Sequence, residues 1–270
     1  MNNIPNDCHI GKNVTINVRG TFELGRCSYI GDNCTINCQN FIAGEYLYMA
    51  DNVEIGRGGS NNPDAIVTIG DHVGIFENTI INPNSPVTIG DNVGIGAEVM
   101  IWTHGAWLDI TQGFPADFGP VTIGNNVWLP ARSIVLPNTT IGDNCVIGIG
   151  STITKDIPAG SMAAGTPCKV LRENFYPKKL STQELTDLIN PILDYWKNTL
   201  APNKNITTVT ELKFVSKSKL VILHQGDNIT YYNVEDKTIE GYNNEVTEDL
   251  RDFLRRRGIK IYTGKPFKSI

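Results

Sequence analysis

Aliphatic residues recur at every sixth position through the stretch 123–153. The six positions are Ile123, Leu129, Val135, Ile141, Ile147 and Ile153. An α-helix repeats every 3.6 residues and a simple strand every two, so neither gives this spacing. A period of six predicts a solenoid of short stacked strands, in which no single repeat can bury its apolar face alone.

The same repeat extends towards the N-terminus in a relaxed form. The signature Ile-Gly-Asx-Asn, or a variant of it, begins at Ile10, Ile30, Met49, Ile69, Ile89, Ile123 and Ile141. Apart from the step between Ile89 and Ile123, successive signatures follow one another at nearly equal spacing, which predicts one triangular coil of three short strands per signature. Asn at the fourth place of the signature suits a left-handed corner, because Asn tolerates positive φ better than most residues.

The step from Ile89 to Ile123 departs from this spacing. It is much longer than the neighbouring steps from Ile69 to Ile89 and from Ile123 to Ile141. We expect the surplus to leave the solenoid as an extruded loop at about 105–120. Long loops in compact domains commonly carry function.

The hexad pattern fades after Ile153, and the composition changes after Arg172. Residues 173–270 are predicted to form a small α/β appendage. Its expected elements are a helix opened by the capping box Ser181–Glu184, strands at 219–224 and 228–234, a helix at 247–257 and a last strand at 259–263. The sequence therefore predicts a mainly β domain over 1–172 and an appendage of unknown role.

Charge and cysteine content narrow the class of protein. Residues 1–172 hold 8 Lys/Arg against 15 Asp/Glu, whereas residues 173–270 hold 15 against 13. The acidic solenoid argues against nucleic-acid binding, and no apolar run is long enough to insert in a membrane. The six cysteines show no metal-ligand spacing, and the first residues lack a signal-peptide pattern. We expect a cytoplasmic protein that needs no metal.

The text from Val121 to Arg172 reads VTIGNNVWLPARSIVLPNTTIGDNCVIGIGSTITKDIPAGSMAAGTPCKVLR. Its hexads, the Val-Trp pair, Thr154-Lys155 and the closing Ala-Gly-Thr-Pro resemble the left-handed β-helix acyltransferases, in particular the maltose, galactoside and nodulation-type O-acetyltransferases. The resemblance covers about residues 10–172. It implies a left-handed parallel β-helix that uses acetyl-CoA, acts as a homotrimer and has its active sites in the grooves between subunits.

The resemblance also assigns residues to acetyl-CoA by motif position. Trp128 and Ala131 would line the pantetheine channel, and Ile149, Thr154 and Lys155 would lie along its length. Arg172, with Lys169 near it, would meet the nucleotide phosphates. The scarcity of cations in the repeat region agrees, because Lys155, Lys169 and Arg172 are three of only eight there and a phosphate needs such partners.

His104 is the candidate catalytic base. It lies directly before the extruded loop and is expected to point outward at a corner, where the family places its histidine. His72 occupies an Asn-type corner position, His9 precedes the first hexad, and His224 ends an appendage strand. A sugar hydroxyl is a poor nucleophile at neutral pH, so a base that titrates near that pH can take its proton.

Residues near His104, or matching the family's acceptor contacts, are candidates for substrate binding. Asp109, Glu77 or a backbone carbonyl could orient the imidazole. Asn78 matches the second Asn of the family's Asn-x-Asn acceptor contact, whereas Phe76 replaces the first. Trp102 and Trp107 flank His104 and would form walls for a sugar ring or pack the loop on a neighbouring subunit.

Other functions remain open on sequence grounds. N-acetylation of an amino-sugar nucleotide would use the same base and the same acetyl-CoA groove. A γ-type carbonic anhydrase would need three converging histidines. A trimeric scaffold whose appendage binds a partner would not need His104. A covalent mechanism through Cys168 lacks a histidine tied to that thiol, and direct transfer needs no acyl-enzyme.

Overall fold

The structure is a computed structural model that describes residues 4–267 of the chain. It divides into two compact units, residues 1–178 and 179–270. This division falls a few residues beyond the boundary that the change in composition predicts.

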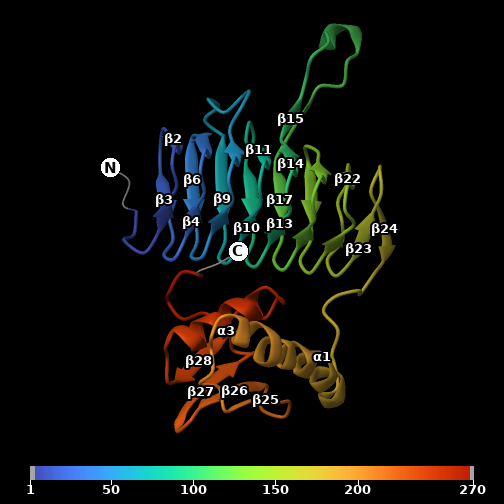
Figure 1. The fold of residues 1–270 in the computed structure, drawn as a ribbon. Coiled ribbons are helices and arrows are strands. Elements are labelled where there is room, and N and C mark those ends of the chain that lie inside the picture. Colours follow the sequence, from blue (N-terminus) through green and yellow to red (C-terminus); the bar gives the residue numbers. More distant parts are fainter. Residues whose placement is uncertain (1–3, 268–270) are drawn as a thin grey trace. The chain divides into compact units, whose positions relative to one another are not determined.

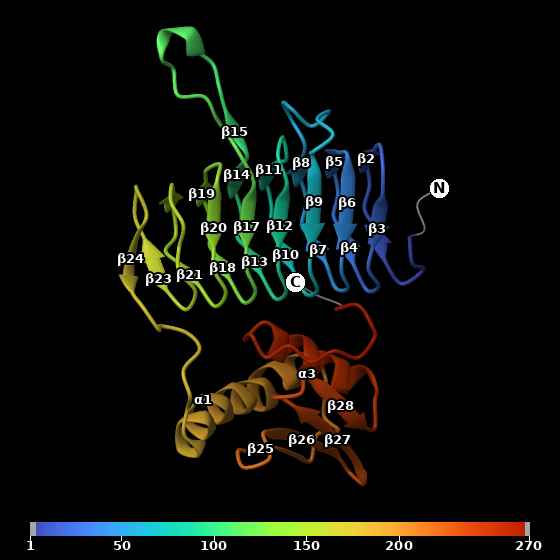
Figure 2. The ribbon, with the colours of Figure 1, turned by 180° about the vertical axis from the view of Figure 1, so that it is seen from behind.

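The first unit is a left-handed parallel β-helix built from three sheets (Figure 1, Figure 2). Within each sheet every neighbouring pair of strands is parallel, except that β24 runs antiparallel to β23. The first sheet contains β1 (His9–Ile10), β4 (Tyr29–Ile30), β7 (Tyr48–Met49), β10 (Gly74–Ile75), β13 (Gly94–Ile95), β18 (Trp128–Leu129), β21 (Val146–Ile147), β23 (Met162–Ala164) and β24 (Lys169–Arg172).

The second and third sheets complete each triangular coil. The second sheet contains β2 (Thr15–Val18), β5 (Thr35–Cys38), β8 (Glu54–Ile55), β11 (Ile80–Asn82), β14 (Met100–Trp102), β19 (Ile134–Val135) and β22 (Thr152–Ile153). The third sheet contains β3 (Phe22–Leu24), β6 (Asn40–Ala43), β9 (Ile66–Ile69), β12 (Val87–Ile89), β17 (Val121–Ile123) and β20 (Thr139–Ile141).

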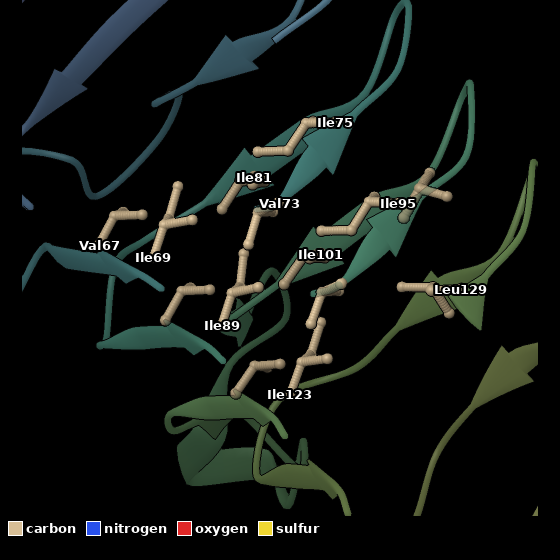
Figure 3. Close-up of a cluster of buried hydrophobic side chains, with 14 of the residues drawn as sticks. Val67, Ile69, Val73, Ile75, Ile81, Ile89, Ile95, Ile101, Ile123 and Leu129 are labelled. Carbon is tan, nitrogen blue, oxygen red and sulfur yellow. The ribbon is translucent and has the colours of Figure 1, made fainter. Parts of the chain in front are cut away.

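The predicted inward positions form the core. All six hexad residues from Ile123 to Ile153 are at most 2% exposed, and equivalent residues stack on them from the earlier coils (Figure 3). The Asn corners adopt left-handed conformations as expected, with φ between 55° and 59° at Asn13, Asn33, Asn52, Asn92, Asn126 and Asn144. His72 takes the same conformation at its corner, with φ of 61°.

The strand pairing corrects the predicted register in the N-terminal half. Met49 pairs with Ile75 in the first sheet and not with the Ile69 signature. Ile69 instead pairs with Ala43 in the third sheet. The signature therefore moves from one sheet to another between Met49 and Ile69. Spacing alone hid this shift, because the step from Met49 to Ile69 equals the step from Ile69 to Ile89.

Chain length varies at only one of the three corners. The inward residues of the first and second sheets stay six positions apart in every coil, as do those of the third sheet and the next first-sheet strand. Between the second and third sheets the connection changes. It is short from Val135 to Thr139, longer from Ile55 to Val67 and longest from Ile101 to Val121.

Two segments leave the β-helix at that corner, on the same edge (Figure 1). We name residues 56–64 the first extruded loop and residues 105–120 the second. The second begins within β15 (His104–Gly105) and contains the 3₁₀ helix η1 (Ile110–Gln112) and β16 (Asp117–Phe118); β15 and β16 pair as an antiparallel ribbon. The first was not predicted.

The second unit is an α/β fold with its own apolar core around Trp196, Tyr232 and Phe253. Its elements are α1 (Thr182–Tyr195), the π-helical turn η2 (Trp196–Leu200), α2 (Ala201–Asn203), β25 (Glu211–Val215), β26 (Leu220–Gln225), β27 (Asn228–Asn233), β28 (Thr238–Gly241) and α3 (Glu245–Arg255).

The predicted elements of this unit are largely present. Ser181 and Glu184 form the expected capping box at the start of α1. The predicted strand at 259–263 is wrong: the backbone of Ile259 bonds to Leu254 and that of Tyr262 to Lys237, and no strand forms there. The antiparallel sheet is completed by β25 and β28 instead.

Candidate active site

His104 lies at the base of the second extruded loop, where the chain leaves the second sheet. Its ring stacks on Phe118, across the ribbon, with centroids 5.8 Å apart and planes inclined by 20°. The Trp102 ring meets the imidazole edge-on, at 6.4 Å and 72°. The two aromatic rings therefore limit the orientations that the imidazole can take.

Thr103 fastens this segment to the preceding coil. Its hydroxyl donates to the Asn82 carbonyl at 2.7 Å and accepts from the Ser85 amide at 3.0 Å. Its carbonyl accepts from the Gly119 amide at 3.0 Å, which closes the base of the loop. Because Thr103 is fully buried, these bonds hold the backbone next to His104 in one position.

The two ring nitrogens of His104 have different surroundings. Nδ1 is enclosed and has no hydrogen-bond partner among residues 4–267. Nε2 faces the first extruded loop: a Cβ atom added to Gly58 would lie 3.9 Å from it. A proton on Nδ1 leaves the Nε2 lone pair free, and this is the tautomer that a base acting through Nε2 requires.

The expected orienting carboxylates are not bonded to His104 in the described chain. Asp109 caps η1, where its Oδ1 accepts from the Thr111 amide at 2.8 Å and from the Thr111 hydroxyl at 2.7 Å. These bonds hold the pKa of the Asp109 carboxyl below its usual value. Glu77 is exposed at another corner, where its carbonyl accepts from the Glu98 amide. Neither supports the imidazole.

Several predicted site residues lie at the corner between the first and second sheets, across the second sheet from His104. Glu77 and Asn78 form this corner in one coil, with Asn78 at φ 58°. Ala131 and Ile149 occupy the equivalent corners two and three coils later, and the Gly150 amide donates to the Ala131 carbonyl at 3.1 Å. The single chain does not bring Asn78 or Ala131 to His104.

The remaining predicted residues are exposed on the outside of the β-helix. Thr154 and Lys155 follow β22, at the same kind of corner as His104, and Lys169 and Arg172 begin and end β24. Trp128 is 45% exposed and lies over Gly94, whose added Cβ would fall 2.6 Å from the indole. Ile149 is 74% exposed and Trp107, on the second loop, 91%.

Sequence reasoning missed the first extruded loop and the residues that hold it beside His104. The Asn82 side chain is fully buried and donates to the Gly58 carbonyl at 3.0 Å. The available signal was the run Gly-Arg-Gly-Gly-Ser-Asn-Asn-Pro from Gly56 to Pro63, which is typical of a loop and offers no inward aliphatic residue.

The described residues form neither a metal-ligand cluster nor a membrane-spanning helix. Within residues 4–267, no group of three His, Cys, Asp or Glu side chains gathers as a possible metal-ligand set. In the same range, no helix combines the length and the apolar character needed to cross a bilayer.

The repeat motif and the parallel coils together define a hexapeptide-repeat protein. Residues 120–155 match the family model described as bacterial transferase hexapeptide (six repeats). Over 134 residues the chain is 39% identical to a galactoside O-acetyltransferase of Escherichia coli, an alignment that covers 47% of this chain and 57% of that protein. The chain is therefore similar to the hexapeptide-repeat acetyltransferases over its repeat region, as its sequence predicts.

Two further proteins are similar to this chain. A putative acetyltransferase of Saccharomyces cerevisiae is 42% identical over 110 residues, which cover 40% of this chain and 56% of that protein. A solved galactoside acetyltransferase in complex with coenzyme A is 30% identical, covering 61% of this chain and 70% of that one, at a TM-score of 0.36. The chain spans less than two thirds of the length of the curated relatives that it matches.

Proposed function

We propose that this protein transfers the acetyl group of acetyl-CoA to a hydroxyl group of a carbohydrate, such as a sugar or a surface-polysaccharide precursor. The observation that carries the proposal is the setting of His104. Its Nδ1 is enclosed, its ring is held between Phe118 and Trp102, and its Nε2 faces the space beside Gly58. The sequence similarity to a galactoside O-acetyltransferase supplies the reaction class.

In the proposed reaction His104 acts as general base and then as general acid. Nε2 takes the proton from the acceptor hydroxyl while the oxygen forms a bond to the thioester carbonyl carbon. When the tetrahedral intermediate collapses, the C–S bond breaks and the departing thiolate receives the proton from Nε2. Base catalysis of this kind contributes on the order of 10²- to 10⁴-fold in rate.

The exposed groups on the C-terminal coils support a groove for acetyl-CoA. Trp128 and Ile149 present apolar surface that a pantetheine arm would cover. Ala131 and Thr154 would line the same path. The exposed cations Lys155, Lys169 and Arg172 suit the phosphates at the nucleotide end. On the acceptor side, Trp102, Trp107, Glu77, Asn78 and Asp109 stay candidates for contact with the sugar.

We infer that the site forms between copies of the chain, in a homotrimer. The support comes from the two corners described above: Asn78 and Ala131 lie across the second sheet from His104 in one chain. A neighbouring copy could place its corner against His104. Co-expression of His104→Ala with Trp128→Ala tests this, because mixed assemblies would regain activity at sites that combine the two intact surfaces. Failure to regain activity would contradict a shared site.

The function is tested by incubating the protein with acetyl-CoA and a panel of sugars and nucleotide sugars. We expect an acetylated product whose ester is released by mild alkali. An alkali-resistant product would show N-acetylation of an amino sugar instead.

His104→Ala should lower kcat by about 10²- to 10⁴-fold and leave the KM for acetyl-CoA nearly unchanged. His72→Asn is the matched control, because Asn keeps the left-handed corner that His72 occupies. Unchanged turnover in His104→Ala would overturn the proposed role and favour a scaffold.

A further inference from the structure

Gly58, in the first extruded loop, is the residue that faces the reactive edge of His104. A Cβ atom added to Gly58 would lie 3.9 Å from His104 Nε2. Apart from the residues next to Gly58 in the chain, no other heavy atom of the described residues would be within 4 Å of it. An oxygen that gives its proton to Nε2 must come within about 2.6–3.2 Å of it. Any side chain at position 58 would therefore stand beside the acceptor oxygen.

The loop that carries Gly58 is held in place by side chains from neighbouring coils. The buried Asn82 amide donates to the Gly58 carbonyl at 3.0 Å. The Asn37 amide donates to the hydroxyl of the buried Ser60 at 3.1 Å, and Arg19 donates to the Asn61 side chain at 3.1 Å and to the Ser60 carbonyl. The loop is thus a fixed wall on one side of the imidazole.

The fold requires glycine at position 59 but not at position 58. Gly59 has φ of +83°, and a Cβ there would fall 2.0 Å from Asn84 Nδ2. Gly58 has neither a left-handed φ nor a close backbone neighbour, so a side chain would fit without strain. A larger residue at position 58 would therefore fill the space next to Nε2.

We propose that Gly58 sets which acceptors the enzyme can use, by leaving room beside His104 Nε2 for the carbon skeleton that carries the reacting hydroxyl. The inference rests on the proposed transferase function and deepens it. It assigns the first extruded loop to the acceptor side of the site, whereas the acetyl donor enters along the C-terminal coils. A small nucleophile such as water would pass a side chain at position 58 that a sugar ring would not.

Kinetics of Gly58→Ala and Gly58→Val test the proposal, with Gly105→Ala as matched control because its added Cβ meets nothing within 4 Å. We expect kcat/KM for the sugar acceptor to fall by about tenfold in Gly58→Ala and further in Gly58→Val. The KM for acetyl-CoA and the slow hydrolysis of acetyl-CoA by water should stay within about twofold. Equal loss of transfer and hydrolysis, or no loss of transfer, would overturn the proposal.

A second measurement needs no acceptor. Diethyl pyrocarbonate modifies exposed imidazole nitrogens, and mass spectrometry can follow the modification of the peptide that holds His104. Gly58→Val should slow this modification at least about tenfold relative to Gly105→Ala, because the branched side chain covers Nε2. An unchanged rate would overturn the proposed geometry. Full transfer activity in His104→Ala would instead overturn the proposed function.

Discussion

The two extruded loops leave the β-helix at the same corner, yet they are held in opposite ways. The first is short and polar, and Asn37, Asn82 and Arg19 bind it from neighbouring coils. Within residues 4–267, the second is fastened to the coils only at its base, by Thr103 and by Asn138, whose amide donates to Asp117 at 2.6 Å. At its tip Trp107, Leu108 and Ile110 are 91%, 63% and 66% exposed.

This difference shows that a loop's rigidity depends on where its bonding partners come from. The β-helix supplies the partners of the first loop, so that loop shares the stability of the core. The second loop supplies most of its own bonds, including the Asp109 cap of η1, so its tip can open without disturbing the coils. One loop is suited to form a wall and the other to reach towards a partner.

The largest expected effect concerns the backbone of the first loop. Gly59→Ala should lower the free energy of unfolding by about 2–3 kcal/mol, because the methyl group meets Asn84 and the φ of +83° disfavours any side chain. Urea denaturation measures this loss. Gly58→Ala is the neighbouring control and should change the free energy by less than about 0.5 kcal/mol. Equal effects at both positions would mean that the loop is not fixed as described.

The next effect concerns the buried anchor of the same loop. Asn82→Ala should destabilise the protein by about 1–3 kcal/mol, since it removes a buried bond to the Gly58 carbonyl. Asn84→Ala serves as comparison, because its amide lies 3.5 Å from the Gly59 carbonyl and its bond is weaker. Chemical denaturation of both variants gives the ranking. A larger loss of stability in Asn84→Ala would show that Asn84, and not Asn82, is the main anchor of the loop.

The tip of the second loop should behave in the opposite way. Trp107→Ala should change the free energy of unfolding by less than about 0.5 kcal/mol, because the indole is almost entirely exposed. The measurement is thermal or urea unfolding at several protein concentrations. A loss above about 1 kcal/mol that grows with concentration would show that another copy of the chain covers the tip.

The smallest effect is local to η1. Because the folded pKa of Asp109 is lowered, its capping bonds contribute fully above the carboxyl's usual pKa near 3.8 and are lost as the pH falls through the lower folded value. NMR titration should find the carboxyl of Asp109 ionised below pH 3.8 and the Thr111 amide released only under more acid conditions. Titration of this carboxyl at or above its usual pKa would show that the cap does not form in solution.

The hexad spacing predicted most of the β-helix, because a period of six in aliphatic residues has one structural solution. It also placed the second loop, since the step from Ile89 to Ile123 is too long for one coil. It failed at Met49 and Ile69, where two signatures one normal step apart lie in different sheets. The extra residues of the first extruded loop give the step from Met49 to Ile69 the length of one normal coil, so the spacing of the signatures does not reveal them.

The surroundings of His104 could be predicted only in part. Its place beside the second loop follows from the sequence. The approach of Gly58 does not, because it depends on the Asn82 side chain reaching one coil back. The predicted carboxylate partners failed for a similar reason: Asp109 has a nearer hydrogen-bond donor in Thr111, and Glu77 lies at another corner.

The restriction of length changes to one corner has a consequence for protein engineering. The strands on either side of the two loops are held by the coils above and below them, so inserted residues between the second and third sheets do not alter the register on either side. The tight corner at 136–138 joins the same two sheets as the corners that carry the extruded loops, but it has no such loop. A peptide grafted there would extend from the same edge as the other loops, which makes this corner a place to add recognition of larger acceptors without redesigning the core.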